Sequence, residues 1–137
     1  MTSKEIQKYQ NKSIPALLKL AEKYFNTFIR NRDRDGDYFY CPTCQKTKKI
    51  EGNNYHACHL FPAGHYPALR FNEDNCFGGC LSCNYYKHGA GHEYVDWVRK
   101  KIGEVRYQRL IDLKDYYKKH GFKWDRFFLI EIIGKYK

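Results

Sequence analysis

Cys41-Pro42-Thr43-Cys44 and Cys80-Leu81-Ser82-Cys83-Asn84 are the two stretches on which the fold depends, because each contains a Cys-x-x-Cys pair. Such a pair forms a tight knuckle with both sulfurs on the same side, so four thiolates at this spacing suit one tetrahedral zinc ion. Three histidines lie between the pairs: His56, His59 and His65. The sequence therefore predicts a structural zinc clamp, formed by Cys41, Cys44, Cys80 and Cys83, around a central segment rich in polar groups.

The length and composition of the chain fit one modest domain that binds a polyanion. The chain has 137 residues and no composition shift or Gly/Ser-rich linker, so we expect a single domain over 1–137. Lys and Arg number 25 against 15 Asp and Glu, which gives a formal net charge of +10. This excess is spread along the chain. It favours nucleic acid as a partner over the plainer alternative, an ordinary soluble protein that happens to be basic.

The cysteines indicate metal binding and a cytosolic protein. No stretch approaches the ~20 consecutive apolar residues that a membrane span needs, and no apolar signal region follows the N-terminal Met1 to Glu5. Disulfides would be typical of a secreted chain, so the knuckle pattern favours zinc. The two remaining cysteines, Cys58 and Cys76, are then expected to be buried small side chains. A zinc set that uses Cys76 with Cys80 is an alternative.

Apolar periodicity predicts helices on both sides of the clamp. Residues 14–32 carry apolar side chains at helical spacing, whereas the short aromatic-rich stretches that follow are typical of strands. From His92 onward the spacing is helical again, with breaks at Gly103 and Gly121. We therefore expect an α+β fold in which an N-terminal helix precedes a zinc-clamped core over 38–91 and a helical part over 92–137.

A histidine at a strand end, an asparagine in the next loop and an asparagine that opens a helix can converge on one point. Here they are His59, Asn75 and Asn84, and the zinc would fix the start of that helix relative to the strands. Phosphodiester hydrolysis needs a base for the attacking water and a positive charge at the leaving oxygen. We expect His59 to be the general base, Asn84 to bind a divalent cation through its amide oxygen, and Asn75 to brace the loop.

Other histidines could complete the cation site. His56 or His88 would add a nitrogen ligand, which favours manganese over magnesium. Each residue also has a plainer explanation. His59 could face the core or lie beside the zinc, His56 and His88 could be surface residues, and Asn75 could simply be a turn residue.

Several basic groups are candidates for contact with a nucleic-acid backbone. Their spread along the chain indicates recognition of backbone and shape more than of bases, with an affinity that falls as salt rises. The aromatic side chains of the helices are instead expected in the core. The basic candidates are Lys46, Lys48 and Lys49 on the first knuckle, Arg70 and Lys87 near the proposed site, and Arg99, Lys100 and Lys101 on the following helix.

One run of residues over about 38–120 carries a family resemblance: His59, Leu69-Arg70-Phe71-Asn72-Glu73-Asp74-Asn75, Cys80-x-x-Cys83-Asn84 and His88-Gly89. It resembles the phage NinG/Rap recombination proteins, which are members of the HNH (His-Me finger) nuclease superfamily. The resemblance implies a ββα-metal core with zinc on the two knuckles, and an endonuclease that depends on Mg²⁺ or Mn²⁺. It also implies branched DNA substrates, such as D-loops and Holliday junctions, in the cytoplasm of a bacterial host.

The chain departs from the family pattern at three places. Family members often read Asp-Ala-Gly-His where this chain reads His56-Ala57-Cys58-His59, so histidine replaces a carboxylate that could help to hold the metal. A family-like Asn-Val-His is Asn75-Cys76-Phe77 here. Ala63-Gly64-His65-Tyr66 also mimics the family string around the base. It lies too close to Leu69-Arg70-Phe71, so spacing favours His59 over His65.

Three functions fit these observations. We favour a metal-dependent nuclease that prefers branched DNA. A catalytically silent zinc module that binds DNA and a zinc-stabilised protein-interaction domain are the alternatives. The apolar C-terminal segment from Trp124 to Tyr136 would either close the core or form a homodimer contact.

Overall fold

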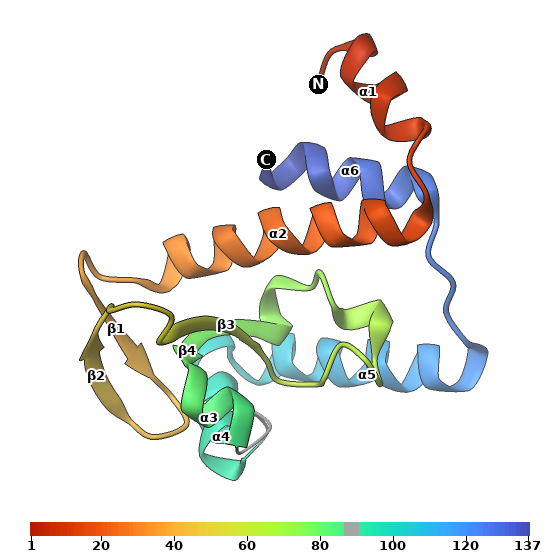
Figure 1. Ribbon diagram of the computed structural model, residues 1–137. Helices are drawn as coiled ribbons and strands as arrows, with labels where there is room; N and C mark the ends of the chain where they lie inside the picture. Colours follow the sequence, from red (N-terminus) through yellow and green to blue (C-terminus); the bar gives the residue numbers. More distant parts are fainter. Residues whose placement is uncertain (87–90) are drawn as a thin grey trace. The chain divides into compact units, whose positions relative to one another are not determined.

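The computed structural model describes residues 1–86 and 91–137 and is drawn in Figure 1. These residues divide into two compact units, one made of residues 1–28 and 123–137 and the other of residues 29–122. Both units contain helices, and the second also contains two small antiparallel sheets. The mixed α+β class expected from the sequence is confirmed, while the single domain remains a prediction.

The first unit is helical. α1 (Ser3–Gln10) begins at Thr2, whose hydroxyl caps it, and α2 (Ile14–Asp33) matches the helix predicted for residues 14–32. α6 (Arg126–Tyr136) contributes buried side chains, so it closes the core of this unit, one of the two roles expected for the C-terminal segment. No helix among the described residues is long and apolar enough to span a bilayer. The buried apolar side chains of this unit include Leu17, Ala21, Phe25, Leu129, Ile130, Ile132 and Ile133.

The second unit opens with a hairpin of β1 (Tyr38–Cys41) and β2 (Lys46–Lys49). The first Cys-x-x-Cys pair begins at Cys41, the last residue of β1, and ends at Cys44 in the turn between the strands. This turn is tight enough that Gln45 takes a left-handed φ of 59° and donates its amide to the Cys41 carbonyl at 2.8 Å. β2 reads Lys-Thr-Lys-Lys and has no apolar alternation, so its pairing with β1 makes it a strand.

A second hairpin and a short helix follow. β3 (Tyr55–His59) and β4 (Cys76–Cys80) pair antiparallel, and α3 (Leu81–Tyr86) begins directly after β4. Gly78 in β4 faces the Tyr55 ring so closely that a Cβ atom would lie 2.4 Å from the Tyr55 hydroxyl oxygen. Only glycine fits there without displacing that ring. The order along the chain is therefore β3, β4 and α3, and α3 begins where β4 ends.

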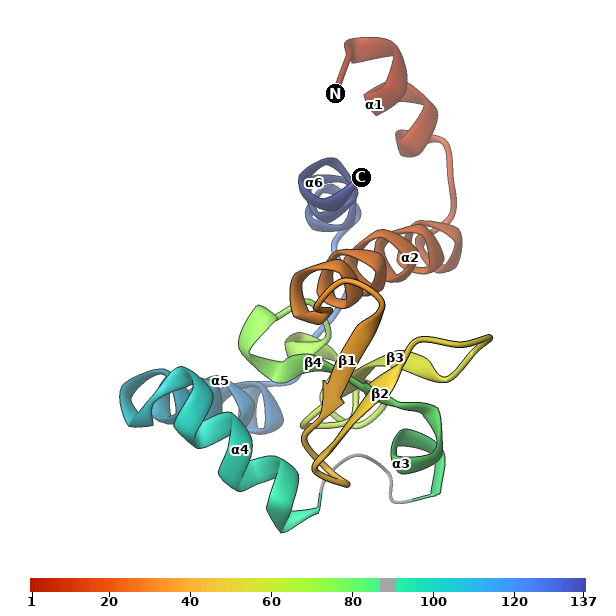
Figure 2. The same ribbon diagram turned by 90° about the vertical axis from the view of Figure 1, so that its left-hand side faces the viewer.

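α4 (His92–Ile102) and α5 (Glu104–His120) are the remaining helices of the second unit and pack together, as Figure 2 shows. They end at Gly103 and Gly121, as the sequence predicts. Both glycines have a positive φ, 85° and 82°, which they adopt without the strain that a Cβ atom would bring.

A buried core joins these two helices to the second hairpin. Tyr94 of α4 is 1% exposed and donates its hydroxyl proton to the Cys58 carbonyl at 2.6 Å. Because Cys58 directly precedes His59, this bond helps to fix the end of β3 at the residue expected to be the general base. The buried members of this core are Cys58, Leu60, Leu69, Phe77, Tyr94, Val98, Ile102 and Leu110.

Candidate functional site

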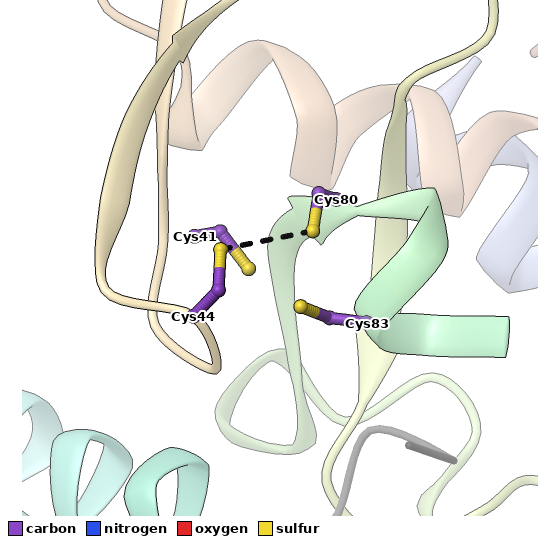
Figure 3. A group of neighbouring side chains, drawn as sticks. All are labelled: Cys41, Cys44, Cys80 and Cys83. Atoms are coloured by element: carbon purple, nitrogen blue, oxygen red, sulfur yellow. Dashed lines mark hydrogen bonds between the residues drawn. The ribbon is translucent and has the colours of Figure 1, made fainter. Parts of the chain in front are cut away.

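The four cysteines of the two knuckles lie together (Figure 3). Their sulfur atoms are all within 4.8 Å of one another, and the Cys44 and Cys80 sulfurs are 3.9 Å apart. In a tetrahedral zinc site with Zn–S bonds of about 2.3 Å, the sulfurs are separated by about 3.8 Å. The cluster of Cys41, Cys44, Cys80 and Cys83 could therefore hold a metal ion such as zinc, as the sequence predicts.

Different secondary-structure elements position the two pairs of sulfur atoms. Cys41 ends β1 and Cys44 lies in the turn that follows, whereas Cys80 ends β4 and Cys83 lies in the first turn of α3. The buried ring of Phe39 stacks on Tyr55 at 4.5 Å between ring centroids, beside the cluster. A bound ion would join the first hairpin to the start of α3.

The cysteines of the cluster differ in how easily they ionise. Burial alone would raise the pKa of Cys80, but hydrogen bonds with Ser82 and Cys83 outweigh it and lower that pKa to about 6. Burial raises the pKa of Cys83 and of Cys44. Burial lowers the pKa of Lys48, but the nearby thiolates of Cys80 and Cys44 raise it by more. Lys48, a predicted DNA contact, is thus a positive charge beside the cysteine cluster.

The other two cysteines lie outside this cluster. Cys58 and Cys76 are buried, and burial raises the pKa of Cys58 to about 12 and that of Cys76 well above its usual value. Both thiols are therefore protonated near pH 7 and behave as small apolar side chains. Among the described residues, the group that could hold a metal ion contains Cys80 without Cys76, so the structure favours the four knuckle cysteines over the alternative zinc set.

A pocket of about 400 Å³ lies where β3, the loop after it and α3 meet. His59 enters it from the end of β3, and Asn84 enters it from α3. His65 also lines it, although its spacing in the sequence argued against it. The structure thus brings together two of the three residues expected to converge, and adds a second imidazole.

The tautomer of His59 follows from one hydrogen bond. Its Nε2 atom lies 2.9 Å from the Arg70 carbonyl oxygen, which can only accept a proton. Nε2 therefore carries the hydrogen, and in the neutral ring Nδ1 keeps a free lone pair. Burial lowers the pKa of His59 more than this bond raises it, so the ring is neutral near pH 7. A neutral, oriented imidazole can accept a proton at Nδ1.

Asn75 is not in the pocket but holds the loop that shapes it. This loop joins β3 to β4 and contains two 3-10 turns, η1 (Pro67–Leu69) and η2 (Glu73–Asn75). The Asn75 side chain is fully buried; its oxygen accepts from the Phe61 amide at 2.9 Å, and its nitrogen donates to the Phe61 and Leu69 carbonyls. These three bonds tie both ends of the loop together, next to the residue whose carbonyl orients His59.

We expect Asn75→Ala to destabilise the protein by about 3 kcal/mol, because buried backbone groups of Phe61 and Leu69 lose their partner. Urea unfolding monitored by tryptophan fluorescence measures the change. Asn72→Ala is the matched control, since Asn72 makes only one cap bond, to the Asp74 amide at 2.9 Å, and should cost about 1 kcal/mol. Equal losses in the two variants would contradict the bracing role.

His56, one of the two histidines proposed as cation ligands, does not line the pocket. Alternate residues of a strand point to opposite faces, so His56 points away from the face that carries Ala57 and His59. Its Nε2 atom lies 3.2 Å from the Asn53 side-chain oxygen instead. His88 lies outside the described residues, as does the predicted DNA contact Lys87.

The described basic candidates differ in their surroundings. The Arg99 guanidinium makes two 3.0 Å bonds to the Glu104 carboxylate and stacks over the Tyr107 ring. Arg70 is half-buried, and its carbonyl orients His59. Exposed cations that can reach a phosphate are Lys46, Lys49, Lys100 and Lys101.

Comparison with known proteins gives consistent matches to one phage family. The family model described as "NinG: Bacteriophage Lambda NinG protein" matches residues 2–137. Protein ninG of Escherichia phage lambda is 33% identical over 93 residues, which are 64% of this chain and 40% of that protein. Protein ninG of Salmonella phage P22 is 33% identical over 92 residues, 63% of this chain and 39% of that protein. The chain spans about 40% of the length of these relatives. No solved structure matches.

Proposed function

Since this chain belongs to the NinG family of bacteriophage proteins, we propose that it is a metal-dependent endonuclease that hydrolyses phosphodiester bonds in branched DNA. The observation that carries the proposal is the half-buried, neutral His59, held by the Arg70 carbonyl with Nδ1 free to accept a proton. An HNH-type ββα core would then consist of β3, β4 and α3, with the cysteine cluster as its structural zinc site.

In this mechanism His59 removes a proton from the attacking water at Nδ1. The Asn84 amide oxygen and the His65 imidazole line the same pocket and are the side chains that could hold a divalent cation. An amide oxygen suits Mg²⁺, and an added imidazole favours Mn²⁺. Such an ion, when bound, would supply positive charge for the phosphate and the leaving oxygen. Asn84 and His65 alone supply too few ligands for such an ion, so oxygen atoms of the DNA phosphate would have to complete its coordination.

The charge of the chain supports DNA as the substrate. A formal net charge of +10 and exposed lysines on β2 and α4 suit a phosphate backbone. Branched recombination intermediates such as D-loops and Holliday junctions are the substrates that the sequence resemblance implies. An enzyme that reads backbone and shape can select such structures without reading their sequence.

A catalytically silent DNA-binding zinc module is the second candidate. One observation favours it: no carboxylate lines the pocket within the part of the chain that the structure describes. Where family members often carry Asp, this chain has His56, and its ring points away from the pocket. The same cysteine cluster and lysines would then serve binding alone.

One assay distinguishes the nuclease from the DNA-binding module. Zinc-loaded protein is incubated with end-labelled Holliday junction, D-loop and plain duplex of the same sequence, with Mg²⁺, with Mn²⁺ and with neither. The nuclease predicts cleavage that needs the added cation and is about tenfold or more faster on the branched DNAs. A gel shift of these DNAs without cleavage under any condition would replace the nuclease with the binding module.

A further inference from the structure

A second pocket, of about 270 Å³, lies on the other side of His65 within the second unit. One wall is the loop segment from His65 to Leu69, and the other is formed by the last turns of α5 together with Phe122. His65 is therefore common to this pocket and to the His59 pocket. The two pockets are therefore neighbours, and a ligand that occupied both would lie against His65.

The walls of this second pocket combine aromatic rings with positive charge. Tyr66, Tyr117 and Phe122 line it, and the Tyr117 and Phe122 rings meet edge to face at 5.4 Å between centroids. Lys114 and Lys118 contribute ammonium groups. No acidic residue is among those that line it within the described part of the chain.

The two lysines have different surroundings. The Lys114 ammonium lies over the Phe61 and Tyr66 rings, 5.2 and 5.8 Å from their centroids, and pairs with the Asp115 carboxylate at 3.2 Å. It therefore holds the aromatic wall in place. Lys118 is exposed at the rim of the pocket. An anionic group that enters the pocket would meet Lys118.

We propose that this pocket binds one unpaired nucleotide next to the scissile phosphate, with its base against Tyr66, Tyr117 and Phe122 and its phosphate at Lys118. The inference rests on the proposed nuclease function, because the His59 pocket defines where the scissile phosphate lies. Aromatic faces accept any base by stacking, and a nearby cation fixes the backbone. The volume lies just below the ~300 Å³ at which typical small-molecule sites begin, so it suits a single nucleotide.

Such a pocket would explain a preference for branched DNA. A base inside a continuous duplex is stacked and paired, and it costs a few kcal/mol to extrude it. The cost is lowest where a base is already unpaired, as it is at a branch point or a bulge. The pocket would thus select the structure of the DNA at the point of cleavage, without reading its sequence.

Binding without added divalent cation tests the pocket separately from catalysis. The probe is a fluorescein-labelled duplex with a single-nucleotide bulge, compared with the fully paired duplex of the same sequence by fluorescence anisotropy. We expect the wild-type protein to bind the bulged DNA about tenfold more tightly. Lys118→Gln and Phe122→Leu should each remove most of this preference, because they remove the phosphate contact and the stacking face.

Two control variants change residues of the same kind that do not line the pocket. Lys119→Gln removes an exposed lysine next to Lys118, and Tyr38→Leu removes an exposed aromatic ring in β1. Both variants should keep the preference for the bulge. Equal wild-type affinity for the two duplexes, or test and control variants that behave alike, would overturn the proposal.

Cleavage of the same two DNAs with Mg²⁺ or Mn²⁺ separates failure of the pocket from failure of the nuclease. Bulge preference that depends on Lys118 and Phe122, without any cleavage, would overturn the nuclease and support the nucleotide site. Cleavage without bulge preference would overturn the nucleotide site and support the nuclease.

Discussion

The variant His59→Ala should lose cleavage by a factor of about 10² to 10⁴, because it removes the base that accepts the proton of the attacking water. Its affinity for junction DNA and its zinc content should stay close to those of the wild-type protein, since His59 is not part of the cysteine cluster. The measurement is the single-turnover cleavage rate on an end-labelled Holliday junction with saturating Mn²⁺.

His56→Ala is the matched control for this experiment. It removes an imidazole from the same strand, but one that points away from the pocket and meets Asn53. Its cleavage rate should stay within about threefold of the wild type. If both variants cleave normally, His59 is not the base. If both variants lose cleavage equally, the loss reflects a disturbed β3 strand and not the removal of a base.

The pH profile gives a second readout of the same residue. Burial lowers the pKa of His59 below its ordinary value of 6.5, so the ring loses its proton at a lower pH than a free imidazole does. The cleavage rate should therefore rise with pH, reach half of its plateau below pH 6.5 and stay constant up to neutral pH. A midpoint above pH 6.5 would contradict the assignment of His59 as a half-buried, neutral base.

The second large effect is expected at the metal centre. Cys80→Ser should prevent tight zinc binding and abolish the cooperative thermal transition of the second unit, because metal binding supplies folding free energy to small metal-stabilised structures. In zinc-finger peptides this free energy is on the order of 10 kcal/mol. Without zinc, only the buried core between α4, α5, β3 and β4 would stabilise this unit. Differential scanning calorimetry and zinc content by mass spectrometry measure the two effects.

Cys58→Ser is the control for the cysteine variant. Cys58 is as buried as Cys80, 3% against 2% exposed, but lies outside the metal-binding group. A buried hydroxyl there should cost about 1 to 3 kcal/mol and leave one zinc ion per chain. A Cys80→Ser protein that binds no zinc yet melts like the wild type would show that the cluster does not stabilise the fold.

The features that depend on local spacing could be predicted from the sequence. Each Cys-x-x-Cys pair fixes its own turn and the two spacings together match a four-cysteine metal site, so the cluster could be expected; α2 follows from apolar residues at helical spacing. α1 (Ser3–Gln10) was not predicted because Ile6 and Tyr9 are too few apolar residues to form a recognisable face.

Features that depend on tertiary contacts could not be predicted in the same way. β4 contains Gly78-Gly79, and paired glycines in a run usually argue against a strand, but here Gly78 makes room for the Tyr55 ring. His65 lines the pocket together with Pro62, whose carbonyl accepts from the His65 and Tyr66 amides in a tight turn, and the distance in sequence between His65 and Leu69 does not reveal this turn. His56 does not line the pocket because successive residues of β3 point to opposite faces, which the spacing of the histidines alone does not show.

The two halves of the cysteine cluster also differ in how soon they can form as the chain folds. Cys41 and Cys44 share a hairpin with a tight turn, and hairpins of that kind form in about 1 to 10 μs. Cys80 and Cys83 reach the same place only after β4 has paired with β3 across a long connection, a non-local step that is slower. Zinc could bind the first pair before the second pair is in place, and the site would be complete only after β4 has paired. The refolding rate of this unit should therefore depend on the concentration of free zinc.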